Sequence, residues 1–266
     1  MNGKDVEYPF TITRLNTVFD YTWEKSTHFD GEAHNFWEAV YVLSGEVEVV
    51  ENEKIYILNA QKFILHAPME FHRIRSFGGT APHFFVLTFE HKGALPEILA
   101  GGCFSLNRTE AEEYEAIFHR ARSWFLNDEQ SPSDGALPAA YLTAFLLKVA
   151  KTHTPEERPA PEKQAEEYRR VARVMQQAVC ENLTLPDIAA RACVSVATMK
   201  SLFAAFSGTS PKRYYALLRM REAEKLLSAG STVSEAAEAL GFSSPNYFSL
   251  FFKRNAGFSP GKLKNK

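Results

Sequence analysis

The apolar residues between positions 34 and 90 form short runs of β-branched and aromatic side chains, a pattern that predicts β-strands. Pairs of turn-forming residues, such as Ser44-Gly45 and Glu51-Asn52, separate the runs. The expected strands are 40–43, 47–50, 55–58, 63–66 and 84–89. Short strands at such close spacing are typical of an antiparallel sandwich or barrel, so we expect an all-β N-terminal part.

After residue 110 the apolar residues recur at helical spacing, in two segments separated by a polar stretch at 127–135. The apolar residues are Tyr114, Ile117, Phe118, Ala121, Trp124 and Phe125 in the first segment, and Leu142, Phe145, Leu146 and Val149 in the second. We expect a helical hairpin over 110–151. Its apolar stripe could form the seam of a homodimer, could pack against the β-domain, or could do both.

A linker is expected before the last hundred residues. Residues 152–163 combine charged side chains with three prolines, and proline cannot continue a helix. The chain therefore divides into a β-barrel at 1–109, the hairpin at 110–151, the linker at 152–163 and an all-α domain at 164–266. The predicted fold class is α+β.

Two segments of the C-terminal part repeat one pattern, a short helix followed by a turn and a second helix. Ala189 matches Ala237 at an offset of 48 residues, and beyond the turn Ser195 matches Ser244 at an offset of 49. One residue has therefore been added to the second turn. This is the pattern of the helix-turn-helix unit, which places its second helix in the major groove of DNA.

Capping residues indicate where the helices of both units begin. Ser195 and Ser244 suit the N-cap position, and Pro245 follows at the first helical position, where its missing N–H costs nothing. Gly241 can adopt the positive φ of a tight turn, and Cys193, its counterpart in the first unit, is expected to be a small buried residue. The preceding helices open with two pairs at capping-box spacing, Thr184 with Asp187 and Thr232 with Glu235.

The second helix of each unit divides into an inward apolar face and an outward face. The inward residues are Met199, Leu202, Phe203 and Phe206, then Phe248, Phe251 and Phe252. The outward residues are Ala197, Thr198, Lys200 and Ser201, then Ser244, Asn246, Tyr247, Ser249, Leu250, Lys253 and Arg254. Asn246 can bond adenine and Lys200 can bond the acceptors of guanine. Phosphate contacts are expected from Lys212, Arg213, Lys253 and Arg254, although each of these side chains could simply be solvated.

Residues 212–228 between the two units are expected to form one long helix that holds the units apart. If the separation is about 34 Å, one turn of B-DNA, both recognition helices can enter successive major-groove segments on one face of the duplex. The apolar face of this helix comprises Tyr215, Leu218, Ala223, Leu226 and Leu227.

Charge divides the chain in the same way. Residues 163–266 hold 16 Lys and Arg against 8 Asp and Glu, a formal charge of +8, whereas residues 1–162 hold 14 against 24, or −10. Clustered positive charge favours contact with a polyanion. The three cysteines show no disulfide or zinc pattern, and we find no export signal or membrane-spanning run, so we expect a cytoplasmic protein with no membrane association.

These motifs closely resemble the DNA-binding domain of AraC/XylS-type transcriptional regulators over nearly all of 165–262. The second unit carries the resemblance most clearly, in Gly-Phe-Ser-Ser-x-x-Tyr-Phe-Ser-x-x-Phe-Lys-Arg followed by Gly-Phe-Ser-Pro. The resemblance implies one domain with two helix-turn-helix units bridged by a linker helix. Leu250 stands where Arg is common, and Ala197 and Ser201 stand where larger residues are common, so base preference does not transfer.

A second resemblance concerns the N-terminal part. By the period of two, His34, Phe36, Glu38, Val40 and Val42 share one face of a strand. With Pro68-Met-Glu-Phe-His72, the segment partly resembles the two cupin motifs of sensor domains in these regulators, although Phe36 replaces a histidine and Ala60-Gln61 replaces a Gly-Asp turn. The candidate effector-binding residues are His34, Phe36, Glu38, Tyr41, His66 and His72.

His34, Glu38 and His72 could alternatively bind a divalent metal, or the barrel could be purely structural. We predict no cofactor. The predicted function is a sequence-specific transcriptional regulator that binds double-stranded promoter DNA as a homodimer, responds to a small-molecule effector in the barrel and, if it is an activator, contacts RNA polymerase. We do not expect an enzyme; the alternative is a metal-dependent cupin enzyme carrying a DNA-binding tail.

Overall fold

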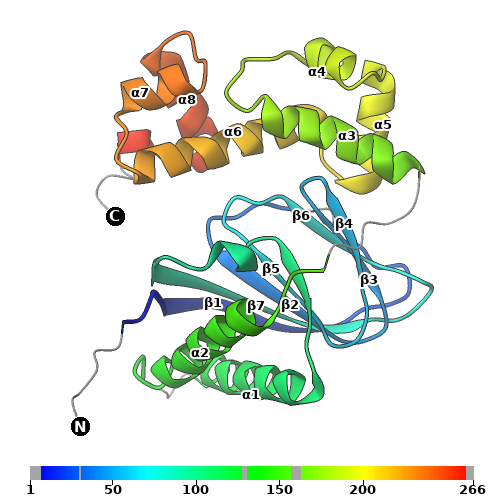
Figure 1. Cartoon of the computed structure of the whole chain (residues 1–266), viewed down its shortest axis with the longest axis vertical. Helices are drawn as coiled ribbons and strands as arrows, with labels where there is room; N and C mark the ends of the chain where they lie inside the picture. Colours follow the sequence, from blue (N-terminus) through cyan, green and yellow to red (C-terminus); the bar gives the residue numbers. More distant parts are fainter. Residues whose placement is uncertain (1–6, 30, 128–130, 157–162, 262–266) are drawn as a thin grey trace.

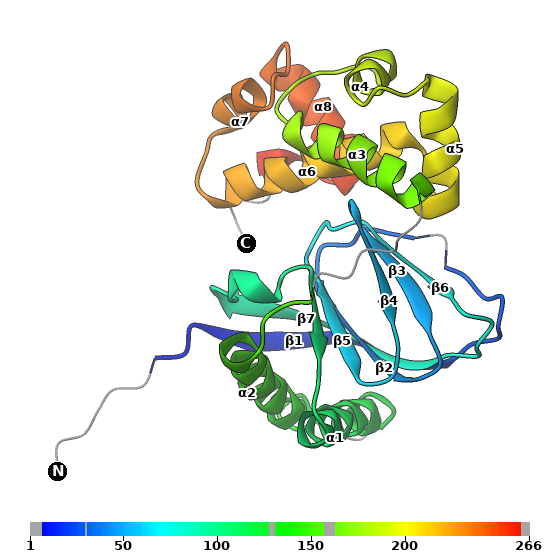
Figure 2. The same ribbon diagram turned by 45° about the vertical axis from the view of Figure 1, so that its right-hand side comes forward.

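The computed structural model describes residues 7–29, 31–127, 131–156 and 163–261 of the 266-residue chain. The strands and the first two helices form one part of the molecule, and the helices between residues 163 and 256 lie together above the ends of the strands (Figure 1 and Figure 2). Residues 157–162, within the predicted linker, and residues 262–266, at the end of the predicted C-terminal domain, lie outside the described residues.

The N-terminal strands form two antiparallel sheets and not one closed barrel. The larger sheet has the order β1-β7-β2-β5-β8 and the smaller the order β4-β3-β6. The strands are β1 (Phe10–Thr22), β2 (Trp37–Ser44), β3 (Val47–Glu51), β4 (Lys54–Leu58), β5 (Lys62–His66), β6 (His72–Ser76), β7 (His83–Gly93) and β8 (Gly102–Ser105). The five predicted strands are present as β2, β3, β4, β5 and β7.

The strands β1, β6 and β8 were not predicted, and for β1 and β6 the omission has a physical reason. Register shifts between Ile12 and Arg14 and between Leu15 and Thr17 interrupt the alternation of β1 along its partner β7. Strand β6 contains one aliphatic residue, Ile74, among polar ones. Neither strand therefore shows the regular alternation that predicts a strand from sequence.

Strand β2 has two faces with different surroundings, as the period of two predicts. Val40 and Val42 are buried between the sheets with residues of β3, β4 and β7. Ala39 and Tyr41 point the other way, into a core shared with the helical hairpin. Glu38 precedes Val40 by two positions, so its side chain also faces the inside of the sandwich.

The predicted hairpin is present as α1 (Arg108–Phe125) and α2 (Ala136–Thr152), and it packs on the outer face of the larger sheet. Phe118 stacks on Phe85 of β7 with ring centroids 3.8 Å apart. Asn107 and Glu110 cap α1 through a reciprocal capping box. The inward halves of both apolar stripes are therefore buried against the sheet.

The C-terminal helices are α3 (Lys163–Gln177), α4 (Leu185–Arg191), α5 (Val196–Phe206), α6 (Pro211–Ser228), α7 (Val233–Ala239) and α8 (Pro245–Ala256). The caps predicted at Ser195 and Ser244 are confirmed, since each side chain accepts a hydrogen bond from the backbone N–H three residues on. Both predicted capping boxes are also present, at the starts of α4 and α7. Gly241 has φ of 68° in the second turn, as predicted.

Cys193 differs from the prediction. Its φ is 54° and its side chain is exposed, so it is not the small buried residue that we expected. It occupies the turn position that Gly241 fills in the second unit, and the backbone there directs a side chain outward.

Among the described helices, none alone has the length and hydropathy needed to cross a membrane. The bent pair α4 and α5, with 89° between its helices, reaches the threshold by length and composition only.

Candidate DNA-binding and effector sites

The helices α5 and α8 present the predicted recognition faces to the outside of the C-terminal part. The inward residues Met199, Phe203, Phe248 and Phe252 are fully buried, and Phe251 is half-buried. The side chains predicted to meet DNA are exposed, except Ser244 and Ser249, which are half-buried; the exposed ones are Ala197, Thr198, Lys200, Ser201, Lys212, Arg213, Asn246, Tyr247, Leu250, Lys253 and Arg254. The structure therefore gives both helices a surface free to contact a groove.

Leu250 is a large apolar side chain that remains 67% exposed on α8. An exposed leucine gains little on a protein surface, whereas the methyl group of thymine is an apolar partner in the major groove. Leu250 can therefore offer DNA only an apolar contact, whatever base it meets.

Arg219 of α6, which the sequence analysis did not single out, connects the two helix-turn-helix units. It is buried, and its Nη1 and Nη2 donate to Asn182 Oδ1 at 2.9 Å and to the carbonyl of Leu240 at 2.6 Å. Its guanidinium also lies 4.1 Å from the centroid of the Phe242 ring. The linker helix is thereby joined both to the segment before α4 and to the turn before α8.

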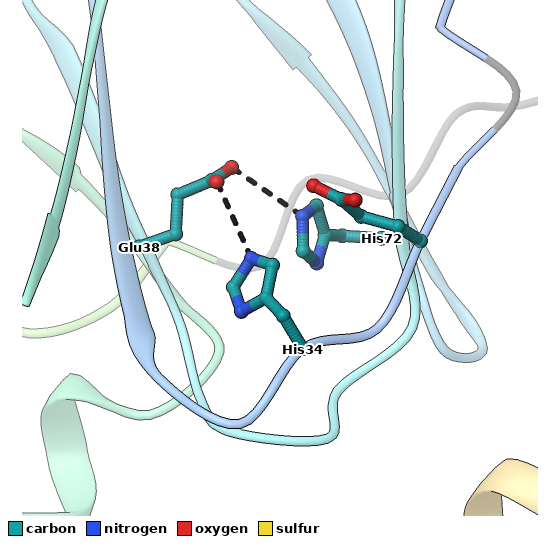
Figure 3. Close-up of side chains that lie close together, drawn as sticks. His34, Glu38 and His72 are labelled. Carbon is teal, nitrogen blue, oxygen red and sulfur yellow. Dashed lines mark hydrogen bonds and ion pairs between the residues drawn. The ribbon is translucent and has the colours of Figure 1, made fainter. Parts of the chain in front are cut away.

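Inside the sandwich, His34 and His72 converge on the carboxylate of Glu38 (Figure 3). Their Nε2 atoms lie 3.3 and 3.4 Å from the two carboxylate oxygens. Each Nδ1 donates to a backbone carbonyl, that of Phe36 for His34 and that of Glu70 for His72, which fixes both rings with Nε2 toward Glu38.

Electrostatics favours the charged forms of Glu38 and His72. Burial alone would raise the pKa of Glu38, but the charge of His72 and hydrogen bonds from both histidines hold it below its ordinary value. Burial alone would lower the pKa of His72, but the charge of Glu38 and its hydrogen bond raise the pKa to about 9. Each partner therefore favours the charged form of the other.

A second group of buried titratable residues lies beside the first. His66 stacks on His72 with centroids 4.3 Å apart, and its Nδ1 is 2.9 Å from Glu51 Oε1. Glu70 accepts hydrogen bonds from Asn52 Nδ2 at 2.7 Å and from the backbone N–H of Ala67 at 2.9 Å. His66 was expected from the sequence but Glu51 and Glu70 were not, because these acids lie in other strands and loops.

Of the six candidate effector residues, five lie together and one lies apart. His34, Phe36, Glu38, His66 and His72 are linked by the contacts above and by stacking of His34 on Phe36, with centroids 3.9 Å apart. Tyr41 is on the opposite face of β2, where its hydroxyl donates to Glu115 of α1 at 3.0 Å. Tyr41 therefore belongs to the hairpin contact.

The donor atoms of the two groups suit a divalent transition metal, since they combine imidazole nitrogen with carboxylate oxygen. Within each group these atoms lie within 4.8 Å of one another, and the groups are Glu32, His34, Glu38 and His72, and Glu51, His66 and Glu70. The residues present thus fit a metal, and they equally form an ion-paired network without one. Glu32 was not predicted. The expectation that His34 and Phe36 share one face of a strand with Glu38 is wrong, because β2 begins only at Trp37 and the segment before it has no strand period.

Comparison with known proteins supports the interpretation of the C-terminal part. A protein family described as "Helix-turn-helix domain" matches residues 188–266. The uncharacterized HTH-type transcriptional regulator YfiF of Bacillus subtilis is 24% identical over 247 residues, which span 87% of this chain and 77% of that protein. The transcriptional activator NphR of Rhodococcus sp is 35% identical over 103 residues, 38% of this chain and 30% of its own length.

Among solved structures, ToxT from Vibrio cholerae aligns over 97% of this chain and 98% of its own, with 16% identity and a TM-score of 0.37. The matched family, the related regulators, and the paired, capped units with exposed recognition helices agree. The chain is therefore a DNA-binding transcriptional regulator with a helix-turn-helix domain at its C-terminus.

Proposed function

We propose that the protein regulates transcription by binding promoter DNA with both helix-turn-helix units, under the control of a small molecule bound in the N-terminal sandwich. The observation that carries the proposal is the pair of exposed recognition helices, α5 and α8, held on one linker helix. The related proteins are named as transcriptional regulators, and the proposed role is accordingly regulatory and not enzymatic.

Base contacts are proposed for Lys200 of α5 and Asn246 of α8, because both are exposed near the first turns of their helices, where recognition helices meet base edges. Ala197, Ser201, Tyr247 and Leu250 would flank these contacts. The positive side chains Lys212, Arg213, Lys253 and Arg254 would bind phosphates and set the register on the duplex.

The effector site is proposed to lie inside the sandwich, around His34, Phe36, Glu38, His66 and His72. Glu38, His66 and His72 are buried polar groups in an otherwise apolar interior, and His34 and Phe36 are half-buried beside them. Such groups fix the orientation of a ligand through a few directed hydrogen bonds. We therefore propose that residues 1–109 form the sensing domain, 110–151 the hairpin, 152–163 the linker and 164–266 the DNA-binding domain.

The hairpin is also the proposed homodimer seam, through residues that the sheet leaves exposed. Phe125, Leu126, Leu137 and Tyr141 are 36%, 73%, 49% and 45% exposed, and all lie toward the ends of α1 and α2 that meet at the connecting turn. Mass measurement in solution tests this, and a monomer at high concentration would reject it. The proposed site of action is the cytoplasm, with RNA polymerase as a partner if the protein is an activator.

The first experiment is a footprint of the full-length protein on the DNA upstream of its own gene and of the neighbouring genes, at near-physiological salt. Two protected major-groove segments about 10 base pairs apart are expected, because the two units would follow one face of the duplex. One protected segment would mean that a single unit reads the operator. No protection on any of these fragments, with or without extracts containing metabolites, would contradict the proposal.

A further inference from the structure

A cavity opens on the inner side of β1 and β7, next to the network of His34, Glu38 and His72. Its volume is about 160 Å³, and aromatic rings and two carboxylates dominate its lining. The lining residues that matter here are Tyr21, Trp23, Phe36, Phe84, Glu32 and Glu38. Since a water molecule occupies roughly 30 Å³ of liquid volume, the cavity holds a ligand of roughly five to eight non-hydrogen atoms.

The rings around the cavity are held by one another. Trp23 meets Phe84 edge to face with centroids 4.8 Å apart, and Tyr21 lies 5.5 Å from Phe84. Phe36 is fixed by its stacking on His34. Two more rings of the lining, Phe19 and Phe29, are 45% and 38% exposed, so the entrance itself is apolar.

The cavity has a negative electrostatic character. Glu32 and Glu38 contribute two carboxylates against one neighbouring group whose charged form they favour, the imidazole of His72, and no Lys or Arg stands among the described residues of its lining. The pKa of the Tyr21 phenol is raised, by burial and then by the charges of Glu38 and Glu32, which is consistent with a negative environment. A ligand with a carboxylate or phosphate would place a further negative charge beside these acids and would be repelled.

Aromatic ring faces and carboxylates both attract organic cations. The face of an aromatic ring carries negative charge density and attracts an organic cation, with an energy that grows when the cation leaves water. A carboxylate at the same cavity adds charge pairing. An alkylammonium group satisfies both, whereas a neutral molecule of the same shape gains only the apolar contact.

We propose that this cavity binds a small organic cation of the alkylammonium or quaternary ammonium class, held by the ring faces of Tyr21, Trp23 and Phe36 and by the carboxylates of Glu32 and Glu38. The proposal rests on the proposed effector site and names the chemical class of its ligand. Glu38 already contacts both histidines, so Glu32 at the entrance supplies the charge most available to the ligand.

The test measures binding without DNA, by calorimetry and by the fluorescence of the tryptophans, since Trp23 lines the cavity. Full-length protein is freed of metal with a chelator and titrated with tetramethylammonium and choline. The neutral isostere of choline, 3,3-dimethylbutan-1-ol, and the anion 3,3-dimethylbutanoate serve as comparisons. Saturable binding of the cations is expected, with the neutral alcohol at least about tenfold weaker and the anion weaker still.

Two variants locate the site. Glu32→Gln should weaken choline binding by about tenfold while leaving the weak binding of the neutral alcohol unchanged, because only the charge is removed. Glu97→Gln is the matched control, since Glu97 lies in the short helix Glu97–Leu99, outside the cavity lining. Circular dichroism establishes that both variants are folded.

Three outcomes would overturn the proposal: equal binding of choline and the neutral alcohol, choline binding that ignores Glu32→Gln, or no binding of either cation by the folded protein. Binding of added Zn²⁺ or Mn²⁺ in place of the organic cations would assign the acids to a metal. The footprint is independent of these titrations. Failure of the cations with an intact footprint rejects the ligand class alone, whereas a missing footprint with intact cation binding rejects the operator model.

Discussion

Arg221 of the linker helix α6 reaches the N-terminal sandwich, with its Nη1 3.3 Å from Oε1 of the buried Glu70. Other contacts join the same two parts: Tyr168 of α3 donates to the carbonyl of Asn52 at 2.7 Å, and Arg73 of β6 donates to the carbonyl of Phe206 at 3.0 Å. Because Glu70 belongs to the same buried network as His66, the linker helix touches the proposed sensing region directly.

From the contact between Arg221 and Glu70 we expect that Arg221→Gln loosens α6 from the sandwich. Glu70 would lose a charged partner, and since Arg221 is 40% exposed at its side chain, the loss of stability should be modest, about 1 kcal/mol. Amide hydrogen exchange along 211–228 should quicken. The control is Lys225→Gln, one turn further on the same helix, where the side chain is 77% exposed. Equal exchange in the two variants would show that the contact does not hold the helix.

Stability should decline as the pH rises from about 4.5 to about 9, first through Glu51 and Glu70 and then through His72. Burial raises the pKa of Glu51 and of Glu70 to about 7, from an ordinary 4.5. Burial opposes the charge and hydrogen bond of Glu38 at His72, but the pKa of His72 still rises to about 9. Each group binds its proton more tightly when folded, so its contribution is complete below the unfolded pKa and is lost as the pH passes the folded pKa.

His66 acts in the opposite sense, because burial and then the charge of His72 lower its pKa to about 3. Its contribution grows only between about pH 3 and pH 6.5 and is constant above that range. Thermal melts across the pH range check the prediction, and Glu70→Gln should flatten the decline between about pH 4.5 and pH 7. A melting temperature that rises steadily from pH 6 to pH 9 would contradict the assignment of these buried protons.

Arg219→Met should destabilise the C-terminal part by about 2 kcal/mol or more, because the acceptors on Asn182 and Leu240 lose their donors in a buried place. Methionine keeps most of the volume, which separates the hydrogen bonds from packing. Arg213→Met, at an exposed position of the same helix, is the control for stability. Urea unfolding that is the same for both variants would show that packing alone suffices, and that neither the hydrogen bonds nor the cation–π contact of Arg219 stabilises this part.

The sequence predicted the elements that local chemistry determines and missed those that depend on strand pairing. Helix caps such as Ser195 and Ser244, and the helical spacing of apolar residues, depend only on residues close together in the sequence. The structure accordingly contains both helix-turn-helix units where they were expected. The buried network is not local. Glu51 lies opposite His72 in one sheet and Glu38 opposite His66 in the other, and no single strand shows that register.

The same reasoning explains why the sequence pattern placed Tyr41 among the effector-site residues and did not identify Glu70. Tyr41 shares a strand with Glu38 but stands at an odd spacing from it, so its side chain points into the hairpin core. Glu70 lies in the turn between β5 and β6, where periodicity gives no direction to a side chain. Contacts across the domain interface, such as that of Arg221, leave no pattern along the chain.

Asn246→Ala and Arg254→Ala should separate base recognition from phosphate contact. If Asn246 bonds adenine, its loss costs about 1–3 kcal/mol on the footprinted operator and nothing on unrelated duplex. Arg254→Ala should weaken binding to both duplexes and reduce the slope of log affinity against log salt by about 1. Lys151→Ala, an exposed cation at the end of α2, is the matched control and should change neither.

Gel shifts at several salt concentrations measure these differences on the operator and on a duplex of scrambled sequence. Equal losses on both duplexes for Asn246→Ala would remove it from base recognition and leave Lys200 of α5 as the proposed reader of sequence. A salt slope unchanged by Arg254→Ala would place that side chain away from the phosphates. Because Ser244 caps α8 through its own hydroxyl, neither substitution removes the helix start, and an altered affinity therefore reports on contact with DNA.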